Sequence, residues 1–167
     1  MLRGLLADLG LAGYRPFYCD RQFVLALLGG MLVWLAFWLV FPGLLPAVPF
    51  MDNVPLFLSL VLWQPVLEEL LFRGVVQGQF RLGVWGGEKR WGMTHANLLT
   101  SVLFVFAHAF YHPPLWAVAV FVPSLVFGYF RDRYGNIYPS MALHVYYNTG
   151  FFCLGHYIPS SWLPVGF

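Results

Sequence analysis

The sequence predicts an all-α, polytopic transmembrane helix bundle of about five spans, preceded by an N-terminal interfacial helix. Of its 167 residues, 60% are apolar and only 10% are charged, whereas soluble domains carry about 25% charged residues. Several apolar runs are long enough to cross a hydrocarbon core of about 30 Å. Helices satisfy all their backbone groups within such a core. The net charge of +2 provides no basic surface for nucleic acid. We therefore expect one integral membrane domain over residues 1–167.

Five apolar runs predict the spans. The first has twenty residues and no charge, and it starts too far from the N-terminus to be a cleavable signal peptide. A Pro/Gly-rich stretch at residues 42–49 follows it, and a polar connector at residues 81–95 separates the second run from the third. The five runs cover residues 22–41, 54–79, 96–111, 115–130 and 137–158.

The N-terminal piece, residues 1–21, is too polar to span the membrane. Leu2, Leu5, Leu6 and Leu9 nevertheless share one face of a helix. An amphipathic helix of this kind lies along the membrane surface, and we expect the same here.

The basic residues predict the orientation. They precede the first run, lie between the second and third runs and follow the fourth, whereas the other two loops and the tail after the fifth run have none. The positive-inside rule then places the N-terminus in the cytoplasm, and we expect a bacterial cytoplasmic (inner) membrane. The basic residues that set this orientation are Arg3, Arg15, Arg21, Arg81, Lys89, Arg90, Arg131 and Arg133.

The second run contains three charged residues, Glu68, Glu69 and Arg73. A charge inside a span costs about 2.5–3.5 kcal/mol on insertion and usually marks function. Glu69 and Arg73 are four residues apart with the acid first, which is the favourable order for an ion pair. Glu68 is turned by about 100° from Glu69 around the helix, so it is the less neutralised carboxylate and suits a general base. The alternative is a purely structural ion cluster.

Two further pairs, Phe104 with His108 and His144 with Asn148, each place polar chemistry on one helical face. Alone, each pair could be packing or a hydrogen bond between helices. With a rise of about 1.5 Å per residue, Glu68 lies about 13–18 Å from the inner end of its span. His108 lies about 16–18 Å deep, and His144 and Asn148 about 10–17 Å. We therefore expect these four polar side chains to line one cavity.

The ordered motifs Glu-Glu-x-x-x-Arg, Phe-x-x-x-His and His-x-x-x-Asn resemble the CPBP/Abi family of glutamic intramembrane proteases. That family includes Rce1-type CAAX endoproteases and bacterial relatives linked to bacteriocin processing or immunity. The resemblance covers about residues 64–150, the motif-bearing core of the expected protease domain. It implies that Glu68 activates water, that His108 helps to hold it, and that His144 and Asn148 stabilise the oxyanion. It also implies supporting roles for Glu69, Arg73 and Phe104.

The same resemblance implies a membrane-associated protein or peptide substrate, with no metal and no cofactor. Three substrate classes stay open: a prenylated C-terminal tail, a leader peptide and a C-terminal membrane anchor.

Other interpretations of the same residues also stay open. Glu68, His108 and His144 form a legitimate zinc ligand set, although the chain has no H-E-x-x-H motif. Ser140, four residues before His144, is the best serine nucleophile, but no buried acid is evident to orient that pair. A non-enzymatic immunity or scaffold protein would keep the motifs for packing alone.

Overall fold

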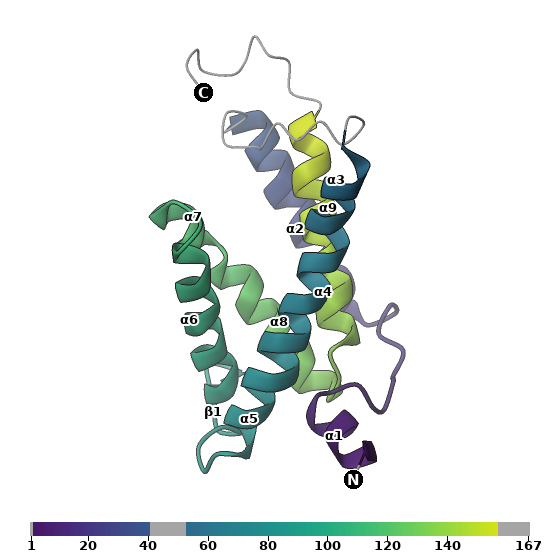
Figure 1. Ribbon diagram of the computed structural model, residues 1–167, viewed down its shortest axis with the longest axis vertical. Helices are drawn as coiled ribbons and strands as arrows, with labels where there is room; N and C mark the ends of the chain where they lie inside the picture. The colour runs from purple at the N-terminus through teal and green to yellow at the C-terminus, as the bar shows by residue number, and fades with distance from the viewer. Residues whose placement is uncertain (1, 41–52, 157–167) are drawn as a thin grey trace. The chain divides into compact units, whose positions relative to one another are not determined.

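The structure, a computed structural model, describes residues 2–40 and 53–156, and these are mostly helical (Figure 1). The Pro/Gly-rich stretch at residues 42–49 and the tail after the fifth run lie outside the described residues. The elements, in chain order, are α1 (Leu2–Asp8), α2 (Arg21–Val40), α3 (Val54–Leu58), η2 (Ser59–Trp63), α4 (Gln64–Glu69), η3 (Leu70–Val76), α5 (Gln77–Leu82), β1 (Lys89–Arg90), β2 (Met93–Thr94), α6 (His95–Ala109), α7 (Pro114–Ala119), α8 (Phe121–Tyr134) and α9 (Tyr138–His156).

The chain divides into two compact units. The first comprises Met1–Phe17 and Leu67–His144, and the second Tyr18–Val66 and Val145–Phe167. Every sequence-predicted site residue except Asn148 falls in the first unit. The expectation of one domain over the whole chain stays a prediction.

Among the described residues, three helical stretches are long and apolar enough to cross a membrane: Arg21–Val40, Val54–Leu82 and Pro114–Tyr134. Only 11% of the residues in the most apolar part of the first stretch are buried within the protein. Such a helix would be poorly solvated by water, but hydrocarbon is a suitable solvent for it. The chain is therefore an integral membrane protein. Because α6 has only 15 residues, the predicted count of five spans stays a prediction.

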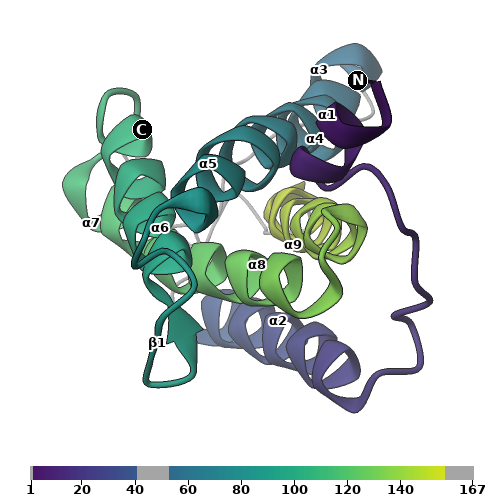
Figure 2. The same ribbon diagram turned by 90° about the horizontal axis from the view of Figure 1, so that it is seen from below.

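In the first unit, α6 lies beside both α5 and α8 (Figures 1 and 2). Thr94 caps α6 by accepting a hydrogen bond from the Asn97 backbone N–H at 3.1 Å. The Asn97 amide then donates to the Leu125 carbonyl of α8 at 3.0 Å. A Cβ at Gly128 would overlap the Asn97 side chain, so glycine permits the close approach of these two helices.

The N-terminal segment of this unit holds the ends of α8 and α9 through its backbone. Carbonyls of residues 8, 11 and 13 accept hydrogen bonds from Arg131, Tyr138 and Asn136, at 3.2, 2.8 and 3.1 Å. The predicted helix is present as α1, and its position along a membrane surface stays a prediction.

The polar connector contains a structure that the all-helical expectation missed. Strands β1 and β2 pair antiparallel, with Lys89 opposite Thr94 and Arg90 opposite Met93. The two residues between the strands, Trp91 and Gly92, both have positive φ, 52° and 83°, as a tight hairpin turn requires. Glycine at the second position is the sequence signal for this turn.

In the second unit, tyrosines of α9 bond to the backbone of α2. The hydroxyl groups of Tyr146 and Tyr147 donate to the carbonyls of Leu27 and Ala26, at 3.4 and 2.9 Å. Gly30 of α2 faces the Tyr147 ring, where a Cβ would come within 2.6 Å of it. These contacts fix the register of α9 against α2.

Candidate active site

The helical stretch Val54–Leu82 that carries the three charges is not a regular α-helix. Two segments, η2 and η3, have π-helical pairing, and η3 begins directly after Glu69 and contains Arg73. Single π-turns within α-helices are frequent at functional sites. No feature of the hydrophobic pattern predicts this widening.

Glu69 and Arg73 form the predicted ion pair, with Arg73 Nη1 lying 3.1 Å from Glu69 Oε1 and both side chains fully buried. That expectation is confirmed. A buried pair of this kind is costly to separate, because either partner alone would be an uncompensated charge in a dry interior.

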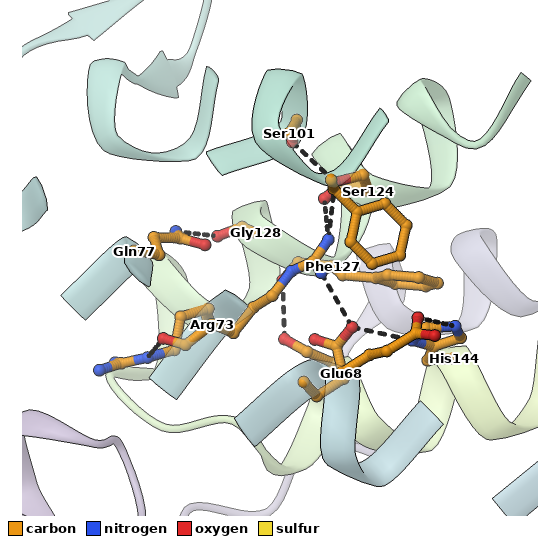
Figure 3. Close-up of polar contacts among 12 residues, drawn as sticks. Glu68, Arg73, Gln77, Ser101, Ser124, Phe127, Gly128 and His144 are labelled. Atoms are coloured by element: carbon orange, nitrogen blue, oxygen red, sulfur yellow. Dashed lines mark hydrogen bonds and ion pairs between the residues drawn. The ribbon is translucent and has the colours of Figure 1, made fainter. Parts of the chain in front are cut away.

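Arg73 has further partners that the sequence did not reveal. Its Nη2 donates to the carbonyl of Ser124 at 2.9 Å and to the Ser124 hydroxyl at 2.8 Å (Figure 3). The Ser124 hydroxyl donates in turn to Ser101 at 2.9 Å. The Arg73 guanidinium also lies over the rings of Phe104 and Phe127, at 4.8 and 5.3 Å from their centroids. In the sequence, Ser101 and Ser124 are recognisable only as hydroxyl residues within two apolar runs.

His144 lies between the two glutamates. Its Nδ1 is 2.9 Å from Glu69 Oε1, and its Nε2 is 3.7 Å from Glu68 Oε2 (Figure 3). A carboxylate paired with arginine only accepts hydrogen bonds, so the first contact places a proton on Nδ1. The imidazole ring stacks on Phe127, with centroids 4.7 Å apart and planes inclined by 20°. The ring orientation is thus fixed by a hydrogen bond and an aromatic face.

Glu68 and Glu69 therefore have different surroundings although they are adjacent. The Glu68 side chain is 30% exposed, whereas that of Glu69 is 0% exposed. Glu69 shares one oxygen between Arg73 and His144. At 3.7 Å, the distance from Glu68 Oε2 to His144 Nε2 is longer than a direct hydrogen bond. Of the two carboxylates, that of Glu68 can therefore accept a hydrogen bond from a further group.

The Phe104 and His108 pair also lies in the first unit. His108 Nδ1 is 2.9 Å from the Phe104 carbonyl oxygen. Because a carbonyl oxygen only accepts hydrogen bonds, Nδ1 carries the proton, and Nε2 is available as an acceptor. The two rings lie 4.3 Å apart, and Phe104 also contacts the ring of Phe72 at 4.9 Å. His108 interacts electrostatically with Glu68 and with His144.

His112 follows His108 by four residues. It stacks on His108, with ring centroids 5.6 Å apart and planes inclined by 22°. The spacing of four residues between these histidines was the signal that could have linked them.

Asn148 follows His144 by four residues on α9 but belongs to the second unit. There its amide donates to the carbonyl of Leu60 at 3.0 Å. The expectation that it joins the other three polar side chains in one cavity stays a prediction.

Two alternatives raised by the sequence can be compared with these contacts. The Ser140 hydroxyl is buried and donates to the Phe127 carbonyl at 2.7 Å, while both ring nitrogens of His144 face glutamates. Within the described part of the chain, no three His, Cys, Asp or Glu side chains are grouped so that they could hold a metal ion. Neither finding tests the roles themselves.

Comparisons with known proteins agree with the motif resemblance. A family model described as type II CAAX prenyl endopeptidase Rce1-like matches residues 50–150. The chain is also similar to an uncharacterized 24.3 kDa protein of Escherichia coli, with 32% identity over 111 residues. That similarity covers 60% of this chain and 49% of the relative, so the chain spans about half the length of the curated protein it matches. No solved structure matches the chain.

Proposed function

This chain belongs to the Rce1-like family, and on that premise we propose that it is a membrane endopeptidase in which Glu68 activates the hydrolytic water. The observation that supports this role most directly is the contrast between the adjacent glutamates. Glu69 is buried with Arg73 and His144, whereas Glu68 is partly exposed and keeps room beside His144. A general base has to reach the water whose proton it takes, and the partial exposure of Glu68 supports that role for it.

In the proposed reaction, Glu68 takes a proton from water while the water oxygen attacks the carbonyl carbon of the peptide bond. The tetrahedral intermediate then collapses, the carbon–nitrogen bond breaks, and the proton held by Glu68 passes to the leaving amine. Proton transfer by a positioned side chain contributes about 10²–10⁴-fold to a rate. His108 would hold the same water through Nε2, because its Nδ1 is committed to the Phe104 carbonyl.

His144 and Asn148 are the proposed donors to the oxyanion. With Nδ1–H committed to Glu69, His144 can donate through Nε2 only when the ring carries both protons, and Glu68, 3.7 Å away, is the counter-charge on that side. The Asn148 amide has two N–H groups, of which one donates to Leu60 and the other is left for the oxyanion. Glu69 and Arg73 would hold the His144 ring in place without touching the substrate.

The family description makes a prenylated C-terminal peptide the first substrate to test, and a leader peptide and a C-terminal membrane anchor follow. We also propose the orientation with the N-terminus in the cytoplasm of a bacterial cell, because the Lys and Arg residues alternate between successive loops as the positive-inside rule requires.

The test uses pure protein in liposomes with the three peptide classes. Glu68→Gln keeps the shape of the side chain and should reduce cleavage by at least about 10²-fold, while Glu88→Gln, an exposed carboxylate, should leave it unchanged. Asn148→Ala should cost about 10²–10³-fold, as the loss of one oxyanion donor does.

Ser140→Ala and a chelator should both leave cleavage intact. Full activity of Glu68→Gln would contradict the glutamic mechanism. Loss of cleavage in Ser140→Ala would favour a serine nucleophile, and loss with the chelator would favour zinc. Failure of the folded wild-type protein to cleave any of the three peptides would favour the non-enzymatic role.

A further inference from the structure

A cavity of about 260 Å³ lies in the first unit, away from Glu68 and the histidines. It is open to the outside on one side and is lined by the end of α1, the last turn of α5 and the end of α8. Two arginines line it, Arg81 and Arg131, together with Asp8, Asp132 and the small residues Ala7 and Gly78. The volume is slightly below the range of about 300–1,000 Å³ that is typical of small-molecule pockets, so it suits a compact polar group.

The two arginines differ in how their charges are compensated. Arg81 Nη1 pairs with Asp132 Oδ1 at 2.6 Å, and the second oxygen of Asp132 accepts a hydrogen bond from the Thr94 hydroxyl. Both oxygens of Asp132 are thus engaged. Arg131, only 6% exposed, donates instead to two backbone carbonyls, those of Arg73 at 3.1 Å and Asp8 at 3.2 Å.

No carboxylate in residues 2–40 or 53–156 forms an ion pair with Arg131. The Asp132 carboxylate attracts the Arg131 guanidinium and the Arg81 guanidinium repels it, but neither is bonded to it. A buried guanidinium that is bonded only to neutral carbonyls favours an anion beside it. The cavity adjoins Arg131 and provides the space for such an anion. The guanidinium also packs closely against Gly10, which has φ of +69° and where a Cβ would come within 2.7 Å of it.

The location of the cavity indicates which kind of anion it could bind. The cavity lies at the end of the unit that carries Arg81, Lys89, Arg90 and Arg133, the end that the positive-inside rule assigns to the cytoplasm. Basic pockets between membrane helices on this side bind lipid headgroups, and a guanidinium fork matches the oxygens of a phosphate.

We propose that the cavity between α1, α5 and α8 binds a phosphate group through Arg131 and Arg81, as presented by an anionic phospholipid headgroup. The site is independent of the proposed peptidase activity, so its test needs no substrate. A bound phosphate would join the N-terminal segment to α5 and α8, and it would thereby stabilise the unit that holds Glu68.

The experiment measures lipid binding to the full-length protein in detergent, as the rise of the thermal unfolding midpoint with increasing phosphatidylglycerol. Phosphatidylcholine is the lipid control, and inorganic phosphate is a separate arm. Arg131→Gln and Arg81→Gln should each weaken the response to phosphatidylglycerol about tenfold or more, as expected when a charge-assisted contact is lost. The matched control, Arg90→Gln, removes an exposed charge from the hairpin of the same unit and should bind as the wild type does.

Equal responses of the wild type to phosphatidylglycerol and phosphatidylcholine would overturn the proposal. So would equal binding by Arg81→Gln and Arg90→Gln. If Arg131→Gln fails to fold, Arg81→Gln decides the question, because the partner of Arg81 is the Asp132 side chain and not the backbone of another segment. Saturation by inorganic phosphate with the same dependence on both arginines would support the phosphate site and identify free phosphate as its source.

Discussion

Replacing Arg73 by Met should destabilise the protein far more than replacing an exposed arginine on the same helical stretch. Arg73 is fully buried, pairs with Glu69 and donates to both oxygens of Ser124. Methionine removes the charge and the donors but keeps much of the apolar stem. Removing one partner of a buried ion pair costs about 3–5 kcal/mol, because the other charge is left buried and unpaired. Since the free energy of unfolding of folded proteins is about 5–15 kcal/mol, this change would remove a large part of the protein's stability.

The measurement is the free energy of unfolding in detergent micelles without phospholipid, followed by circular dichroism. The control is Arg81→Gln, because Arg81 also pairs with a carboxylate but is 38% exposed, and exposed ion pairs contribute about 0–1 kcal/mol. The double variant Arg73→Met with Glu69→Gln should recover part of the loss, since it also removes the orphaned charge. If Arg73→Met were as stable as Arg81→Gln, or if the double variant were less stable than the sum of both single changes, the buried pair would not have the role assigned to it.

Three further predictions concern other parts of the chain. Glu69→Gln should lower both folded yield and peptide cleavage, whereas Glu68→Gln should lower cleavage alone; gel filtration beside the cleavage assay checks this, and the reverse pattern would exchange the two roles. Gly128→Ala should displace the Asn97 side chain, which it would overlap, and lower the unfolding midpoint, by about 2–4 °C for each kcal/mol lost in a chain of this length. In a Cys153→Ala background, Cys19, which is exposed, should react with a membrane-impermeant maleimide in inverted vesicles but not in intact cells, and labelling in intact cells would contradict the proposed orientation.

The parts of the site that depend on spacing along one helix could be predicted from the sequence. Glu69 and Arg73 meet because residues four apart share a face, and the π-helical segment that follows Glu69 does not disturb that contact. The proximity of Glu68 to His144 followed from an estimate of depth in the membrane, which used only the rise per residue and the positions of Lys and Arg.

The partners that come from other helices could not be predicted in this way. Ser101 and Ser124 lie in separate apolar runs, and nothing in the sequence shows that their hydroxyls face Arg73. The same holds for Arg131, which appeared to be a basic residue in a cytoplasmic loop and instead donates to the Arg73 carbonyl. A positive charge near the end of a span is compatible with a solvent-exposed loop and with a buried contact to a backbone carbonyl. Only the packing of α8 against η3 shows which of the two applies to Arg131.

The adjacent glutamates show how one helix can place two identical groups in different surroundings. Consecutive residues project about 100° apart on a helix, so Glu68 and Glu69 cannot face the same partners. Arg73, one turn further on, meets only Glu69, and His144 then donates its Nδ1 proton to the same carboxylate. These contacts neutralise Glu69 and fix the imidazole, whose other nitrogen consequently faces Glu68 at 3.7 Å. The different exposures of Glu68 and Glu69 therefore follow from their positions around the helix, which direct only Glu69 toward Arg73. A helix with a single glutamate at position 69 would have the ion pair and the fixed histidine, but it would have no carboxylate left to meet a water molecule.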